Sequence, residues 1–221
     1  LGDVYKRQYW GKEDAEQMVP STSSISLTLE NMYTETSLSP LPANATAHEF
    51  YIDGEFQNPA EQAKIGAVID GLKPADEVGF VRVDTSNNMP TAAGLSSSSS
   101  GLSALVKACN RYYDLGLSQE ELAQKAKFAS GSSSRSFFGP LAAWDKESGE
   151  IYKVQTDLKL AMIMLVLNDK QKPVSSREGM KRCMETSTNF KEWIEESRQD
   201  YKDMLDYLAG NNFEHVGQLT E

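Results

Sequence analysis

The alternation of apolar and polar positions predicts several short strands along the chain. From Ser21 onward, Ile25, Leu27 and Leu29 alternate with polar residues, which is typical of a half-buried strand. Five further segments have strand-like patterns: 32–36, 78–83, 137–144, 151–154 and 160–167. The last of these is apolar throughout and is expected to be fully buried.

Turn and capping residues indicate a hairpin followed by a helix. Asp53-Gly54 separates residues 50–52 from 55–56, and this dipeptide supplies the positive φ that a tight hairpin turn needs. Asn58-Pro59 then begins a helix that extends to about Leu72, because proline suits the first helical turn.

The second half of the chain carries more helical patterns. Apolar residues at 102, 105, 106 and 109 recur at three- and four-residue spacing. Ser118-x-x-Glu121 is a capping box for the next helix, and two more helices are predicted from Ser176 and from about Phe190 to Leu208. Residues 130–136 have the small polar side chains of a loop. Strands and helices therefore alternate, which predicts an α+β or α/β fold, and no internal repeat is visible.

The two ends of the chain do not fit this pattern. Residues 1–8 have neither strand nor helix periodicity, and we expect them to be a non-native leader. The sequence stops at Glu221 without a closing element, so we expect a C-terminal part to be missing. Its 221 residues fit one large domain or one and a half smaller ones.

Charge and hydrophobic content narrow the class of protein. The formal net charge of −10 argues against a nucleic-acid partner, because nucleic-acid binding relies on Lys and Arg that neutralise phosphates. The longest apolar run, 160–167, is much shorter than the roughly 20 residues that span a bilayer, and no secretory signal is present. Cys109 and Cys183 lack metal-ligand spacing and are expected to be free thiols in a reducing cytosol. We therefore expect a cytoplasmic protein with no membrane partner.

The segment PTAAGLSSSSSG at 90–101 predicts a phosphate-binding loop. It lies between a predicted buried strand and an amphipathic helix, so its hydroxyls and N–H groups meet at a helix N-terminus, where the helix dipole favours anions. Gly94 lets the backbone approach a ligand closely. The alternative is a Ser-rich linker, which the flanking elements argue against. It is not a Walker loop, because G-x-x-x-x-G-K-[ST] is absent.

Two other segments offer groups for an anionic ligand, each with a plain structural alternative. Arg135, in ASGSSSRSFFGP (129–140), suits bidentate capture of a carboxylate or phosphate, or is an incidental residue of a surface turn. In YWGK (9–12), Tyr9 and Lys12 offer a hydroxyl and a cation, or form an aromatic packing pair and a solvated lysine.

A weaker cluster lies at 168–180, where Lys170, Lys172 and Arg177 place positive charge beside hydroxyls near a helix start. His48 is expected in a polar loop and His215 in the acidic tail. Neither histidine has the spacing of a metal ligand or of a catalytic triad, so both are interpreted as incidental.

Five motifs together closely resemble the mevalonate diphosphate decarboxylase family, a branch of the small-molecule kinase superfamily that includes galactokinase, homoserine kinase and mevalonate kinase. The glycine/serine loop is shared with the sister kinases, whereas YWGK, SGSxxRS and VSSR are more particular to the decarboxylases. The motifs run in order from Tyr9 to about Glu221: YWGK (9–12), PSTSSISLTL (20–29), NNMPTAAGLSSSSSG (87–101), SGSSSRSFFGPLAAW (130–144) and VSSREGM (174–180).

The resemblance implies an α+β fold of two domains. Residues 9–160 are expected to form an N-terminal nucleotide- and substrate-binding domain like domain 2 of ribosomal protein S5. Residues 161–221 are expected to begin an incomplete C-terminal α/β domain.

The resemblance also implies a reaction, the ATP-dependent decarboxylation of mevalonate 5-diphosphate to isopentenyl diphosphate in isoprenoid biosynthesis. ATP, acting with Mg²⁺, phosphorylates the tertiary hydroxyl, phosphate then departs, and carbon dioxide is lost. The full-length enzyme is expected to be a homodimer.

Roles follow for the residues that match the family's motifs. Arg135 is expected to bind and orient the substrate carboxylate, with Ser130 and Ser132 lining the same pocket. The carboxylate and diphosphate end of the substrate is expected to contact Tyr9, Lys12, Ser176 and Arg177. The ATP phosphates with Mg²⁺ are expected to lie against the loop residues Pro90, Ala93, Gly94, Leu95, Ser96, Ser97, Ser98 and Gly101.

Two departures from the family's pattern bear on activity. Gln8 stands where the family has a lysine, and the D-A-G-P-N motif that carries the family's catalytic aspartate has no match after Lys202. Asp203 and Asp206 lie at helical spacing in an acidic helix and are not assigned that role. We therefore expect this chain to retain parts of both ligand sites with little or no turnover. A sister mevalonate or phosphomevalonate kinase and a non-catalytic anion-binding module stay open as alternatives.

Overall fold

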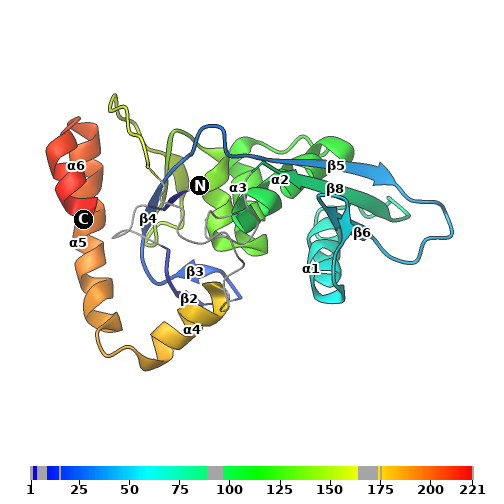
Figure 1. The fold of residues 1–221 in the computed structure, drawn as a ribbon, viewed down its shortest axis with the longest axis horizontal. Coiled ribbons are helices and arrows are strands. Elements are labelled where there is room, and N and C mark those ends of the chain that lie inside the picture. Colours follow the sequence, from blue (N-terminus) through cyan, green and yellow to red (C-terminus); the bar gives the residue numbers. More distant parts are fainter. Residues whose placement is uncertain are drawn as a thin grey trace.

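The computed structural model describes residues 2–3, 9–14, 16–88, 97–163, 174 and 176–220. Within these ranges the chain forms two four-stranded sheets and a two-stranded ribbon, with helices packed around them (Figure 1). Helices and mostly antiparallel strands share one structure, so the predicted α+β class is confirmed.

The first sheet is antiparallel and has the order β1-β4-β9-β10. Its strands are β1 (Gly2–Asp3), β4 (Ser24–Leu27), β9 (Leu141–Trp144) and β10 (Ile151–Lys153). Ile25 and Leu27 of β4 enter a core that also contains Tyr201, Met204 and Leu208 of helix α5 (Phe190–Ala209). Helix α6 (Phe213–Thr220) adds Val216 to the same core. The helices that follow residue 189 thus pack against the first sheet (Figure 1).

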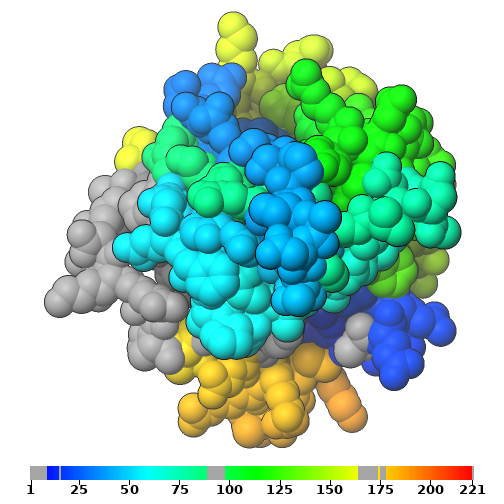
Figure 2. Space-filling view, turned by 90° about the vertical axis from the view of Figure 1, so that its right-hand side faces the viewer, coloured from blue at the N-terminus to red at the C-terminus, as the bar shows by residue number. Residues whose placement is uncertain are grey.

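The second sheet has the order β5-β8-β6-β7. Its strands are β5 (Thr34–Pro40), β8 (Val81–Asn87), β6 (Glu49–Ile52) and β7 (Glu55–Phe56), and only β6 and β8 run parallel. Helix α1 (Pro59–Asp70) contributes Ile65 and Ile69 to the core beneath this sheet. Figure 2 views the molecule from this end, where the blue and cyan residues of β5 to α1 form the surface.

Helices α2 (Ser97–Tyr112) and α3 (Gln119–Ala129) lie between the two sheets (Figure 1). A 3-10 helix, η1 (Gly131–Phe137), follows α3 directly. Helix α4 (Ser176–Thr186) lies beside the ribbon of β2 (Lys12–Asp14) and β3 (Val19–Pro20). These elements contain most of the residues that the sequence predicts to form the functional site.

The local signals in the sequence are confirmed where they were strongest. Asp53 and Gly54 adopt φ values of 50° and 83° at the β6–β7 turn. Asn58 caps α1, and both hydrogen bonds of the predicted capping box form at the start of α3. The helices predicted from Ser176 and Phe190 are also present, as α4 and α5.

Several predicted strands differ from the structure. The strand predicted at 137–144 begins only at Leu141, because Phe137 is the last residue of the 3-10 helix η1. The strand predicted at 32–36 is β5, which covers Thr34–Pro40. Strand β8 begins at Val81 rather than near 78, because Gly79 has a φ of 105° that does not continue a strand, and Val78 is 91% exposed. The buried strand predicted at 160–167 is wrong for residues 160–163, which pair with no described strand and leave Ile163 88% exposed. Residues 164–167 lie outside the described ranges.

Other differences come from contacts that a local pattern does not contain. The expected loop at 130–136 is the 3-10 helix η1, and α6 was not predicted. Gly2–Asp3 pair with β4, although residues 1–8 were expected to add no element. His48 has a structural role that the sequence did not predict, since it is 9% exposed and its Nδ1 accepts a hydrogen bond of 2.9 Å from the N–H of Val81. No helix in the described ranges is long and apolar enough to cross a membrane.

Candidate functional site

The predicted phosphate loop overlaps the start of a helix. Helix α2 begins at Ser97, so residues 97–101 of the predicted loop belong to its first turns, where the N–H groups lack partners within the helix. Ser98 is exposed there and Ser99 is only 3% exposed. A Cβ added at Gly101 would meet open space, so this glycine is not required by packing. The side chain of Ser97 and the residues Pro90, Ala93, Gly94, Leu95 and Ser96 lie outside the described part of the chain.

Arg135 is buried, with only 1% of its surface exposed. Its Nε donates to Ser26 Oγ at 2.9 Å and its Nη1 donates to Ser24 Oγ at 2.5 Å. The alternative of an incidental arginine in a surface turn is therefore wrong. A buried cation is costly unless its donors are satisfied, so the fold has a specific place for this guanidinium.

The strand β4 that receives Arg135 departs from the expected pattern. Alternation predicted that its polar residues would face solvent, yet Ser24 and Ser26 are both 0% exposed. They are buried because they face Arg135, which lies more than 100 residues later in the chain. These two serines are functional candidates that the sequence reasoning missed, although they lie within the motif PSTSSISLTL.

The YWGK segment packs against η1. Tyr9 is 7% exposed and stacks on Trp144, with ring centroids 5.3 Å apart. A Cβ at Gly131 would lie 2.7 Å from the Tyr9 ring, so only glycine permits this close contact. Lys12 is half-buried, and its Nζ lies 3.1 Å from Met18 Sδ. The aromatic packing pair considered for Tyr9 is thus present, and it places the YWGK segment beside the Arg135 helix.

Helix α4 lies close to the same segment. A Cβ at Gly179 would come within 3.6 Å of the Trp10 ring. Ser176 and Arg177 form the first turn of α4, two residues before Gly179, and their side chains lie outside the described atoms. The start of α4 therefore lies next to the YWGK segment.

Serine side chains join η1 to the first turns of α2. The hydroxyls of Ser132 and Ser99 are in hydrogen-bond contact, and Ser130 Oγ lies 3.5 Å from Ser132 Oγ. Ser103 Oγ lies 2.9 Å from the main-chain oxygen of Ser133. The segment predicted to hold the substrate carboxylate is therefore hydrogen-bonded to α2, whose first residues are the last residues of the predicted phosphate loop.

Cysteine and metal chemistry find little support in the described residues. Cys109 is fully buried, and burial raises the pKa of its thiol to about 12, so the reactive thiolate is strongly disfavoured. Within the described ranges no three His, Cys, Asp or Glu side chains gather as metal ligands. Both cysteines are free thiols.

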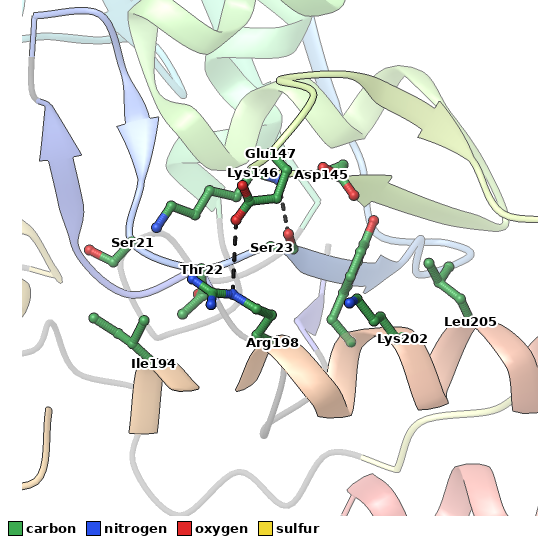
Figure 3. Close-up of a pocket in the computed structure, with 11 residues that line it drawn as sticks. Ser21, Thr22, Ser23, Asp145, Lys146, Glu147, Ile194, Arg198, Lys202 and Leu205 are labelled. Carbon is green, nitrogen blue, oxygen red and sulfur yellow. Dashed lines mark hydrogen bonds and ion pairs between the residues drawn. The ribbon is translucent and has the colours of Figure 1, made fainter. Parts of the chain in front are cut away.

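A cavity of about 150 Å³ lies between α5 and residues 21–23 and 145–147 (Figure 3). Two of the cations that line it, Lys146 and Arg198, lie close to carboxylates. Lys146 Nζ donates to Glu13 Oε1 at 2.5 Å, and Arg198 Nε lies 3.9 Å from Glu147 Oε1. The Arg198 pair joins α5 to the connection between β9 and β10, and the Lys146 pair joins that connection to β2. We assign no ligand to this cavity.

These observations define an α+β protein in which the N-terminus of α2, the buried Arg135 on η1 and the YWGK segment lie close together. Two family models match the chain, the "Diphosphomevalonate decarboxylase-like N-terminal domain" over residues 7–156 and the "Mevalonate 5-diphosphate decarboxylase C-terminal domain" over residues 162–221. The chain belongs to the diphosphomevalonate decarboxylase family, and the resemblance seen in the motifs is confirmed.

Relatives and solved structures agree with this assignment. The diphosphomevalonate decarboxylase of Saccharomyces cerevisiae is 33% identical over 85% of this chain and 53% of its own length. The mevalonate pyrophosphate decarboxylase structure from Streptococcus pyogenes has a TM-score of 0.92 and 65% identity, covering 100% of this chain and 69% of that one. A structure of MDDEF in complex with MVAPP, AMPPCP and magnesium has a TM-score of 0.85 and 33% identity, covering 100% of this chain and 69% of that one. The chain thus spans about half the length of the yeast relative.

Proposed function

We propose that this chain carries the ATP- and substrate-binding groups of an ATP-dependent mevalonate 5-diphosphate decarboxylase. The observation that supports it most directly is the buried Arg135 on η1, which Ser132 and Ser99 join to the first turn of α2. One region thereby offers a cation for a carboxylate beside a helix start for phosphates. The match to MDDEF, whose structure contains MVAPP, AMPPCP and magnesium, supports the same pair of ligands.

The reaction consumes mevalonate 5-diphosphate and ATP. The tertiary hydroxyl attacks the terminal phosphorus of ATP and ADP leaves. The hydroxyl loses its proton as the new O–P bond forms. The substrate's own C–O bond at the tertiary carbon then breaks with loss of phosphate, and the electrons of the C–C bond to the carboxylate form the double bond as carbon dioxide departs. The products are isopentenyl diphosphate, ADP, phosphate and carbon dioxide. Phosphoryl transfer of this kind is catalysed mainly by positioning and by stabilisation of charge, which suits a site built from cations and hydroxyls.

Each site residue has a proposed role in that reaction. Arg135 binds and orients the substrate carboxylate through its fork of N–H donors, and Ser130 and Ser132 line the same pocket. The carboxylate and diphosphate end of the substrate is contacted by Tyr9, Lys12, Ser176 and Arg177. The close contact between Tyr9 and Gly131 supports a common pocket for the two segments.

The nucleotide is proposed to lie at the N-terminus of α2. The exposed hydroxyl of Ser98 and the first N–H groups of the helix suit its phosphates. Mg²⁺ would be held chiefly by the phosphate oxygens, because protein sites supply this ion with few ligands. The other proposed contacts with ATP are Pro90, Ala93, Gly94, Leu95, Ser96, Ser97 and Gly101.

Titration calorimetry with mevalonate 5-diphosphate tests the proposal. Binding rather than turnover is the first readout, because the D-A-G-P-N motif of the family's catalytic aspartate does not occur in residues 1–221. We expect saturable binding of mevalonate 5-diphosphate and of a non-hydrolysable ATP analogue. A chain that binds neither ligand contradicts the proposal. In the full-length protein, carbon dioxide release separates a decarboxylase from a sister kinase, which would accumulate a phosphorylated product.

Three broader properties are proposed alongside the activity. We propose a nucleotide- and substrate-binding domain over 9–160 and the start of a second domain over 161–221, which the limits of the two family models support. The free thiols of Cys109 and Cys183 support a cytoplasmic location. A homodimer of the full-length protein is proposed because twofold dimers are the commonest oligomers, and light scattering tests it.

A further inference from the structure

The guanidinium of Arg135 is held from two directions by neutral groups. Nε–H donates to Ser26 Oγ at 2.9 Å and Nη1 donates to Ser24 Oγ at 2.5 Å. Two bonds to different nitrogens of one planar group fix both its position and its rotation about the Cδ–Nε bond. Arg135 and both serines are at most 1% exposed, so water does not compete for these bonds.

The serines are themselves fixed by the sheet. Ser24 and Ser26 are two residues apart on β4, so their side chains lie on the same face of the strand. On the opposite face, Ile25 and Leu27 are anchored in the core formed with α5 and α6. The β4 backbone is paired with β9, Ser24 opposite Trp144 and Ser26 opposite Ala142. A displacement of either hydroxyl would therefore disturb both the pairing of β4 with β9 and the core that β4 forms with α5 and α6.

A serine hydroxyl suits this position better than a carboxylate would. A carboxylate partner would orient the guanidinium equally well, but it would also neutralise the charge that attracts a substrate carboxylate. A hydroxyl accepts the N–H bond and adds no charge. The two serines thus hold the arginine without cancelling its charge through these contacts.

We propose that Ser24 and Ser26 are positioning residues that orient Arg135 toward the carboxylate of mevalonate 5-diphosphate. This inference rests on the proposed function, which gives Arg135 its ligand. The two serines contact Arg135 and act through it. If they served only to bury an arginine, their loss would weaken every ligand alike or none.

The test compares two ligands that differ at the carboxylate. Mevalonate 5-diphosphate carries it, whereas isopentenyl diphosphate carries only the diphosphate end. Affinities are measured by titration calorimetry for the wild-type chain, Ser24→Ala, Ser26→Ala and the double variant. We expect each single variant to bind mevalonate 5-diphosphate about tenfold more weakly, in line with loss of a hydrogen bond to a charged group, and isopentenyl diphosphate within about twofold of wild type.

Ser21→Ala is the matched control. Ser21 belongs to the same segment and is 1% exposed, and its hydroxyl has no hydrogen-bond partner among the described atoms. Ser21→Ala should leave the affinities for mevalonate 5-diphosphate and for isopentenyl diphosphate unchanged. Circular dichroism on heating checks that each variant folds. Ser24→Cys and Ser26→Cys, which keep a similar volume but accept hydrogen bonds weakly, replace any alanine variant that does not fold.

The outcomes separate the inference from the function on which it rests. If the wild-type chain binds mevalonate 5-diphosphate and the serine variants bind it equally well, the positioning role is wrong and the proposed function stands. An equal loss for both ligands also overturns the positioning role. If the wild-type chain does not bind mevalonate 5-diphosphate, the proposed function fails and the positioning role fails with it.

Discussion

The hydroxyl of Ser103 in α2 lies 2.9 Å from the main-chain oxygen of Ser133 in η1. It also lies 2.7 Å from the main-chain oxygen of Ser99, one turn earlier in its own helix. Ser103 is 7% exposed, so this link is buried. The helix start proposed for ATP and the 3-10 helix that carries Arg135 are therefore joined within a few residues of the sites proposed for the two ligands.

Ser103→Ala should weaken this connection and destabilise the protein. The single hydroxyl proton is shared between the main-chain oxygens of Ser99 and Ser133, and its loss in a buried setting costs about 1 kcal/mol in the free energy of unfolding. Urea denaturation followed by circular dichroism measures the change. Ser187→Ala, at an exposed serine between α4 and α5, is the control and should shift the free energy by less than about 0.5 kcal/mol. Equal stabilities for Ser103→Ala and wild type contradict the link.

Arg135→Lys should weaken substrate binding far more than nucleotide binding. Lysine keeps the positive charge but lacks the planar fork, so it cannot hold Ser24, Ser26 and a carboxylate at once. Titration calorimetry should show roughly a 10- to 100-fold loss of affinity for mevalonate 5-diphosphate and a change of about threefold or less for a non-hydrolysable ATP analogue.

Arg198→Lys provides the comparison, because Arg198 is half exposed on α5 and lies at a different cavity. Its affinities for both ligands should equal those of wild type. If Arg135→Lys weakens the two ligands by the same factor, Arg135 does not act on the substrate carboxylate. A loss confined to the ATP analogue would place Arg135 on the nucleotide side.

The contrast between β4 and the first turn of α3 shows how far the sequence predicts this molecule. The capping box of Ser118 and Glu121 involves residues three apart, so it can be identified from the sequence alone, and it forms. Ser24 and Ser26 look like the exposed positions of a half-buried strand, because alternation carries no information about a partner more than 100 residues away. Their burial depends on where η1 is packed, which is a property of the tertiary structure.

In the candidate site, too, the sequence predicts the residue types but not the contacts between distant segments. Motifs indicated Arg135, Tyr9 and the serines of η1 as ligand groups, and the family resemblance supplied their roles. The contacts that bring them together, such as Gly131 against Tyr9 and Ser132 against Ser99, join segments 33 or more residues apart. No local pattern contains those pairings.

Gly131→Ala should destabilise the fold and move Tyr9. The added Cβ would lie 2.7 Å from Tyr9 Cζ and 2.9 Å from Trp144 Cζ3, and both rings are buried in one cluster. Overpacking of this kind costs about 1–3 kcal/mol in the free energy of unfolding. Thermal and urea denaturation measure it, and affinity for mevalonate 5-diphosphate should fall with it if Tyr9 contacts the substrate.

Gly217→Ala is the matched control, since Gly217 lies in α6 and an added Cβ would meet nothing within 4 Å. Alanine is the better helix former, so this variant should be more stable than wild type by about 0.5–1 kcal/mol. If both substitutions have the same sign and size, the close packing of Gly131 does not control stability.

The free energy of unfolding should fall at alkaline pH, in part because of Cys109. Burial raises the pKa of its thiol from 9.0 to about 12, so the folded protein keeps a proton that the unfolded chain releases once the pH exceeds 9.0. The stabilising contribution is therefore fully present below pH 9.0 and is lost progressively as the pH rises toward 12. Between pH 9 and about pH 11, wild type should lose stability more steeply than Cys109→Ala, by about 1 kcal/mol per pH unit. Burial also raises the pKa of Tyr113 to about 12. This makes the free energy of unfolding fall more steeply with pH in both wild type and Cys109→Ala, so it largely cancels when the two are compared. Parallel curves for wild type and Cys109→Ala, measured by urea denaturation across this range, would show that the thiol proton does not contribute.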